Sequence, residues 1–248
     1  MKQTEQIQLK KKRELTTLCH FAKNLYNEAN YLIRQRFFKE RHWTRYTELN
    51  KVVKTAINYR ALPIQSSQQV LRLLDKTWKS FFKAITDWKK HPDKYLGRPR
   101  LPKYKRKNGE FLVIFTNQQC RITDGFLKFP KRANLTPIKT RMENSFQQVR
   151  IVPRGENYIV EIIYEQDVIN LELNKSRIIG IDLGLTNLVT VVNNIGLNPF
   201  IIKGGLVKSI NQYYNKQIAK FKSIKDKQNY KFETKRLQRL TLKRNNRL

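Results

Sequence analysis

Apolar residues recur at steps of three and four along residues 15–37, the spacing of one face of an amphipathic helix. Such stripes usually pack into a core, so we predict a core-facing helix here rather than a ligand-binding face. The stripe consists of Leu15, Leu18, Ala22, Leu25, Ala29 and Leu32, and it is widened by Tyr26, Ile33 and Phe37.

Two further helices are predicted before residue 90. The first covers Thr44 to Tyr59 and ends before Pro63, because the residue preceding a proline is pushed out of the α region. The second opens with a capping box of Ser66 and Gln69. We predict that the three helices form one all-α unit with Trp78 in its core. The apolar positions of the third helix have heptad-like spacing at Leu71, Leu74, Trp78, Phe81, Ile85 and Trp88.

Short runs of β-branched and aromatic residues replace the helical pattern between residues 110 and 164. Turn signals at Asp124-Gly125 and Arg154-Gly155 separate them, and residues 1–10 alternate weakly as a further strand. Antiparallel strands at this spacing indicate a small barrel or curled sheet, with the helices inserted after its first strand. The predicted strands are 111–115, 126–129, 147–152 and 158–164.

Two more apolar runs, within residues 178–193, flank the turn Leu183 to Thr186 and predict a buried strand with a hairpin partner. Asp182 stands at the inner end of the first run. A charge on a buried strand is costly unless it is paired or holds a metal, so Asp182 is a candidate site residue with an ion or a distant cation as its partner. The alternative is a plain turn aspartate. Residues 199–203 predict a third strand, and the chain beyond Gly204-Gly205 is predicted to be helical and basic.

Composition indicates the class of partner. The 248 residues include 51 Lys plus Arg against 19 Asp plus Glu, a formal net charge of +32. Such an excess favours a polyanion, and nucleic acid is the natural one. We find no apolar run near 18 residues and no signal peptide, so we expect no membrane partner and a prokaryotic cytoplasmic location. Cys19 and Cys120 are far apart and encode neither a disulfide framework nor a zinc site.

Residues 89–107 contain nine basic residues and one acid, and their prolines and glycine exclude a regular helix. An extended basic loop with interleaved tyrosines suits a nucleic-acid backbone, where cations neutralise phosphates and rings stack on bases. The alternative is a solvated linker between domains. The candidate nucleic-acid-binding residues are Arg98, Arg100, Lys103, Tyr104, Lys105, Arg106 and Lys107, together with Arg150 and Arg154 farther along.

The order of these motifs resembles that of the TnpB/OrfB family over almost the whole chain. The segments that carry the resemblance are Gly97-Arg98-Pro99-Arg100, the hairpin 122–130, the strand 148–155 and Gly180-Ile181-Asp182-Leu183-Gly184. The last motif is similar to the first catalytic motif of RuvC-like nucleases and also to the phosphate-binding hairpin of actin-type ATPases. The phosphate-cradling loops of those ATPases have no counterpart here, which disfavours the second likeness.

The resemblance implies an α+β multidomain protein. It would have a wedge-type β-barrel (residues 1–10 and 91–172), a helical recognition unit (11–90) and the N-terminal part of an RNase H-like, RuvC-like nuclease domain (173–248). Family members are RNA-guided DNA endonucleases. The resemblance therefore implies a guide RNA from the transposon end and target double-stranded DNA as partners, with Mg²⁺ held by the aspartate that corresponds to Asp182.

The chain departs from the family pattern after Asp182. Family members carry two further acidic motifs and a zinc ribbon, whereas Asp226 and Glu233 are the only later acids here and are predicted to be surface charges. We expect an N-terminal part of the nuclease that is inactive alone and binds Mg²⁺ weakly or not at all, with the rest supplied by a separate C-terminal fragment. The alternative is a non-catalytic nucleic-acid-binding protein that binds the transposon end or a guide RNA.

Overall fold

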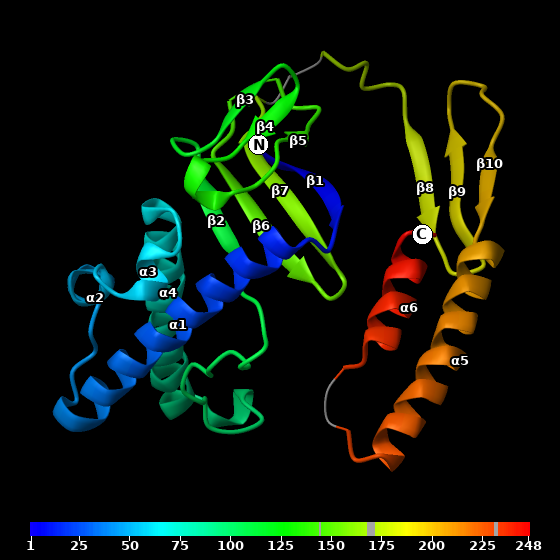
Figure 1. Cartoon of the computed structure of the whole chain (residues 1–248). Coiled ribbons are helices and arrows are strands. Elements are labelled where there is room, and N and C mark those ends of the chain that lie inside the picture. Colours follow the sequence, from blue (N-terminus) through cyan, green and yellow to red (C-terminus); the bar gives the residue numbers. More distant parts are fainter. Residues whose placement is uncertain (144, 168–171, 231–232) are drawn as a thin grey trace. The chain divides into compact units, whose positions relative to one another are not determined.

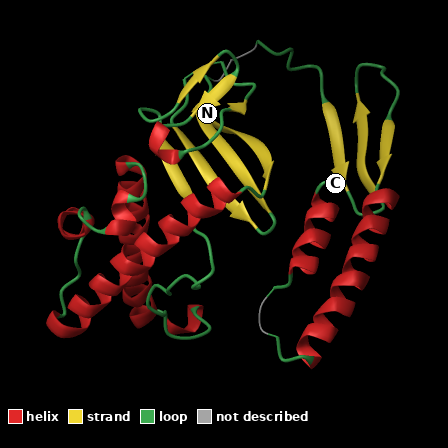
Figure 2. Cartoon of the chain, viewed as in Figure 1, coloured by secondary structure: helices red, strands yellow, loops and turns green. Residues whose placement is uncertain are grey.

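The computed structural model describes residues 1–143, 145–167, 172–230 and 233–248. The chain divides into two compact units, Met1–Asp167 and Val168–Leu248, each of which is described by itself (Figure 1). The mixed α+β class is confirmed (Figure 2). The predicted boundary at 172/173 adjoins residues 168–171, which lie outside the described residues. None of the described helices combines the length and the apolar character that a membrane span requires.

The helices of the first unit bury the predicted apolar faces. Leu15, Leu25 and Trp78 are at most 3% exposed, so the core prediction for these faces is confirmed. The single helix predicted over 44–59 is wrong, because Ala56 adopts an extended conformation and divides it in two. The four helices are α1 (Arg13–Glu40), α2 (Tyr46–Val53), α3 (Ile57–Arg60) and α4 (Ile64–Lys90), and a short 3₁₀ turn, η1 (Pro92–Lys94), follows them.

The predicted capping box at the start of α4 is also wrong. The helix begins at Ile64, directly after Pro63, so Ser66 lies inside its first turn and is fully buried. The neighbouring Ser67 uses its hydroxyl differently and donates to the Tyr59 carbonyl at 2.7 Å. Buried serines near this helix start therefore serve tertiary contacts, one of which joins α4 to α3.

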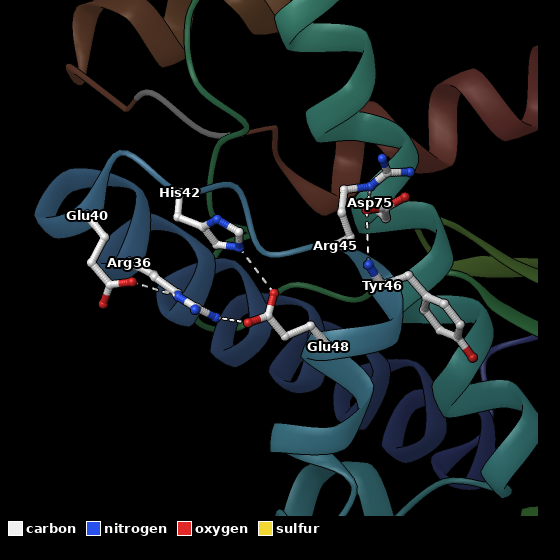
Figure 3. A network of polar contacts seen from close by, with 7 residues as sticks. All are labelled: Arg36, Glu40, His42, Arg45, Tyr46, Glu48 and Asp75. Carbon is white, nitrogen blue, oxygen red and sulfur yellow. Dashed lines mark hydrogen bonds and ion pairs between the residues drawn. The ribbon is translucent and has the colours of Figure 1, made fainter.

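Side chains from other helices fix the N-terminus of α2 (Figure 3). The Tyr46 amide and the Arg45 guanidinium both donate to the same carboxylate oxygen of Asp75 on α4, each at 3.1 Å. Asp75 thus satisfies an amide that the helix itself leaves unpaired. From α1, Arg36 donates to Glu48 and lowers the pKa of that carboxyl. These contacts hold α2 between α1 and α4.

The strands of the first unit form two open antiparallel sheets. In the larger sheet β1 and β2 are opposite edges that the described residues leave unpaired with each other. Of the two expected forms, a small barrel or a curled sheet, the described residues therefore form an open sheet and no closed barrel. Asp124 and Gly125 both have positive φ, as the predicted two-residue turn requires. The larger sheet has the order β1 (Lys2–Lys10), β7 (Asn157–Glu165), β6 (Gln148–Arg154), β2 (Val113–Thr116), and the smaller has β3 (Arg121–Thr123), β4 (Phe126–Lys128), β5 (Ile138–Lys139).

One face of the larger sheet joins the helices in a single core. Alternate residues of β6 and β7, such as Val149 and Val160, are fully buried, as expected for a sheet with one covered face. Phe115 of β2 belongs to the same core as Trp78 of α4. The helices of the first unit and the strands β2, β6 and β7 therefore share one hydrophobic core.

The second unit contains a three-stranded antiparallel sheet and two helices. The predicted hairpin, third strand and following helix are confirmed. Gly204 precedes α5 at a place where only glycine fits, because a Cβ there would lie 2.5 Å from the Leu185 carbonyl oxygen. The elements are β8 (Ile179–Leu183), β9 (Asn187–Asn193), β10 (Phe200–Lys203), α5 (Gly205–Lys227) and α6 (Lys235–Asn245), with sheet order β10-β9-β8.

The prediction that Asp182 sits on a buried strand is wrong. Within the second unit Asp182 is exposed, and Ile179 and Ile181 are 62% and 63% exposed. The physical reason is that α5 and α6 pack on each other. Arg244 of α6, for example, donates to the Asn211 side chain of α5 at 2.8 Å. The described residues of this unit therefore leave the apolar faces of the sheet open.

Candidate nucleic-acid interface

The predicted extended loop 89–107 is wrong at its start, because α4 continues to Lys90 and η1 covers Pro92–Lys94. The rest of it, the basic segment 98–107, has no helix or strand, as predicted, and its backbone is bound along α1. The two run antiparallel, since later loop residues meet earlier helix residues. Four α1 side chains donate to three loop carbonyls: Arg34 and Asn30 to Pro102 O (2.6 and 3.1 Å), Asn27 to Lys105 O (2.8 Å), and Lys23 to Lys107 O (2.6 Å).

The helical periodicity of α1 explains why these four residues act together. Positions 23, 27, 30 and 34 are separated by steps of four, three and four, so they share one helix face. Asn27 also accepts from the Lys105 amide at 2.7 Å, pairing with the loop as a neighbouring strand would. The sequence prediction missed all four residues. The signal in the sequence was that Lys23, Asn27, Asn30 and Arg34 form a polar column at helical spacing beside the apolar stripe.

Burial changes the electrostatics of this column. Lys23 is 3% exposed, and desolvation lowers the pKa of its ammonium group. Its bond to a loop carbonyl supplies one partner for that buried cation. Asn30 is fully buried and lies between the loop and Trp78 of α4. The loop is therefore tied to groups inside the helical core.

Two predicted contact residues of the loop also pack against the protein. The Lys105 ammonium lies 4.9 Å from the Tyr26 ring centroid and 5.0 Å from that of Phe111, within cation–π range. The Arg34 guanidinium lies 4.6 Å from the Tyr104 ring centroid, and Tyr104 is still 44% exposed. Lys105 thus helps to anchor the loop, while Tyr104 presents an aromatic surface that is already stacked on a cation.

The other predicted loop residues have exposed side chains. Because the carbonyls of Pro102, Lys105 and Lys107 are bound to α1, the backbone is held while cations project from it. Phosphate neutralisation needs such exposed cations at fixed positions. The exposed basic residues of the segment are Arg98, Arg100, Lys103, Arg106 and Lys107.

Arg150 and Arg154 lie on a different element, strand β6. Arg150 faces Glu161 of β7 in the strand register, with 4.0 Å between the guanidinium and the carboxylate. Arg154 is exposed at the end of the strand, next to Gly155, whose φ of 63° makes the β6–β7 turn. These two arginines form a second basic position, and the positive charge of Arg150 is partly neutralised.

Asp182 pairs in register with Thr190 of β9 and stands on an exposed strand. Asp226 is near Lys225, at 3.8 Å, and Glu233 is exposed. Within residues 1–143, 145–167, 172–230 and 233–248, no three His, Cys, Asp or Glu side chains gather where they could hold a metal ion. The described side chains around Asp182 therefore do not by themselves form the magnesium site that the family resemblance implies.

The match to a family model lies mainly in the second unit. A family model for OrfB of the IS605 type, described as a probable transposase, matches residues 161–248. Over these residues the chain is similar to the OrfB family. The OrfB match includes Asp182 and the β8–β9 hairpin, and it begins after the basic segment 98–107. A search of the curated proteins found no match.

Two solved structures similar to this chain are Cas12f complexes. One, "Cryo-EM structure of CRISPR-Cas12f Ternary Complex", is 10% identical with a TM-score of 0.40, covering 85% of this chain and 52% of that one. The other, "Cryo-EM structure of the Cas12f1-sgRNA-target DNA complex", is 13% identical with a TM-score of 0.30, covering 97% and 64%. The chain spans about half to two thirds of the length of these neighbours.

Proposed function

We propose that this OrfB-type protein binds nucleic acid through the basic segment 98–107. The proposed ligands are a guide RNA from the transposon end and the target double-stranded DNA that the RNA selects. The observation that carries the proposal is the attachment of the segment's backbone to α1, which leaves a row of cations exposed. A solvated linker, the alternative for this sequence, does not need its carbonyls bound by helix side chains, two of which, Lys23 and Asn30, are buried.

The chemistry of the segment suits a partner that is recognised by its backbone. Arg100, Lys103 and Lys107 offer charge, and Tyr104 offers a ring on which an unpaired base can stack. Proteins of RNA-guided systems leave sequence recognition to base pairing and hold the nucleic acid by shape and phosphates. The formal charge of +32 fits the same division of labour.

We assign Asp182 a separate role, that of a carboxylate contributed by the OrfB segment to DNA cleavage. Its place on β8, outside the basic segment, allows the two roles to be separated by mutation. Asp182→Asn removes the charge and keeps the side-chain shape. The variant should bind RNA with the parent affinity, and weakened RNA binding would place Asp182 in the RNA interface instead.

The test of RNA binding is the salt dependence of the affinity for a stem-loop RNA. The triple variant Arg100→Gln, Lys103→Gln and Lys107→Gln should flatten the slope of log affinity against log salt by about 2 to 3 units, at about 0.7 to 0.9 per lost phosphate contact. The matched control replaces Lys51, Lys54 and Lys79, three exposed lysines of the helical part, by glutamine.

Both triple variants lose the same net charge, so long-range attraction changes equally in the two. A flatter slope in the loop variant alone supports direct contact between the segment and phosphates. Equal slopes in the two variants would overturn the proposal, because the effect would then come from net charge and not from the loop.

A further inference from the structure

We infer that Asn30 is a positioning residue for nucleic-acid binding, acting through the basic segment and not by touching the ligand. This inference rests on the proposed function. Asn30 is fully buried in α1 and connects two groups from distant parts of the chain. Its Oδ1 accepts from Trp78 Nε1 of α4 at 2.9 Å, and its Nδ2 donates to the Pro102 carbonyl at 3.1 Å.

Trp78 fixes the orientation of the Asn30 amide. An indole nitrogen can only donate, so the group that faces Trp78 must be the oxygen of Asn30. The Asn30 NH₂ group is then directed to Pro102, whose nitrogen carries no hydrogen and whose carbonyl is its one backbone polar group. The direction of each bond in the series Trp78, Asn30, Pro102 follows from chemistry.

No other side chain of similar size fills this position. Aspartate could accept from Trp78 but would offer the Pro102 carbonyl no hydrogen at neutral pH, and leucine could do neither. A buried polar group left without its partner is costly, so such a change favours detachment of the loop from α1. Pro102 lies between Arg100 and Lys103, two of the exposed cations of the segment. Detachment at Pro102 would release the cations that the proposed function requires to be held.

The first experiment measures attachment of the loop by limited trypsin digestion followed by mass spectrometry. Trypsin cuts after Lys103, Arg106 and Lys107, and cleavage after the exposed Lys51 serves as the internal reference. Asn30→Asp should speed cleavage in the loop at least tenfold relative to Lys51. Trp78→Phe keeps a large ring but removes the donor that orients the amide, so it should give a smaller acceleration in the same place.

The second experiment measures affinity for the stem-loop RNA. Asn30→Asp should weaken binding about tenfold, and Trp78→Phe should weaken it by a smaller factor. The matched control is Tyr59→Phe, which removes a hydroxyl that donates to Asn50 Oδ1 at 2.9 Å in the same helical unit, away from the loop. This control should leave both loop cleavage and RNA affinity at parent values.

Folding is checked by circular dichroism, and if Asn30→Asp does not fold, Trp78→Phe decides the question. Faster loop cleavage with weaker RNA binding in a folded variant supports the inference. Unchanged cleavage, or faster cleavage with parent affinity, overturns it. The glutamine triple variant separates the two proposals: parent behaviour in that variant refutes the proposed function. A flatter slope of log affinity against log salt in the triple variant, together with parent affinity in Asn30→Asp and Trp78→Phe, refutes only the positioning role of Asn30.

Discussion

The basic segment 98–107 is irregular but firmly bound to the protein, whereas strand β8 is regular but exposed. The segment has no regular backbone structure, but its carbonyls are bound by Lys23, Asn27, Asn30 and Arg34 of α1. Strand β8 has a complete ladder of pairs with β9, but every one of its residues is exposed within the second unit. Regular hydrogen bonding and burial are therefore separate properties in this protein.

The difference arises from what packs beneath each region. Beneath the segment lies α1, whose polar column reaches into a core containing Trp78. Beside β8 the described helices α5 and α6 pack on each other. A surface loop over a formed core is held in place, whereas a strand with an uncovered apolar face gains only its ladder bonds.

The largest expected effect tests the core under the basic segment. Trp78→Ala should lower the free energy of unfolding of the first unit by about 3 to 5 kcal/mol, because a large buried ring is replaced by a cavity. All three tryptophans lie in this unit, so the fluorescence of Trp43 and Trp88 reports its denaturant unfolding in the variant. An unchanged unfolding free energy would contradict the assignment of Trp78 to the core.

A second prediction compares isoleucines of the two sheets. Ile162→Ala on β7, where the side chain is fully buried, should cost about 2 to 5 kcal/mol. Ile181→Ala on β8, where it is 63% exposed, should cost at most about 1 kcal/mol, the span of strand propensities. Residue-resolved hydrogen exchange separates the two sheets. Equal costs would show that β8 is covered in solution, contrary to the comparison.

The smallest expected effect concerns the end of α4, just before the basic segment. Tyr95 donates to the Asp87 carboxylate at 2.7 Å, and this bond lowers the pKa of Asp87. A carboxyl whose pKa is lowered on folding adds stability above its unfolded pKa and loses it as the pH falls through the folded value. Tyr95→Phe should therefore be slightly less stable than the parent near neutral pH, with the difference vanishing in acid. A pH-independent difference would contradict this assignment.

The sequence predicted the helices and strands where one pattern dominated. The stripe from Leu15 to Leu32, the hairpin turn at Asp124-Gly125 and the strand pairing after Asp182 all follow from periodicity or turn chemistry. The break at Ala56 was not predictable, since the apolar positions on both sides of it still fit one helix. The capping box failed because Pro63 begins the helix earlier.

The basic residues of the site could be predicted from the sequence, but the attachment of their backbone to α1 could not. Exposed cations such as Arg100 and Lys103 can be recognised from composition alone. Their attachment to α1 depends on Asn27 and Asn30, whose partners lie more than 70 residues away along the chain and are joined only by the fold. Burial of β8 was predicted from its apolar residues, but burial requires a covering element, and sequence pattern alone does not supply one.

The central claim is that nucleic acid contacts the basic segment while it is held on α1. Lysine acetylation of the unmodified protein, with and without the stem-loop RNA, tests this claim most directly, because the exposed lysines Lys103 and Lys107 can be compared with Lys51 and Lys54 in the same molecule. The account predicts that RNA protects Lys103 and Lys107 at least several-fold and leaves Lys51 and Lys54 unchanged. Equal reactivity of Lys103 and Lys107 with and without bound RNA would contradict it.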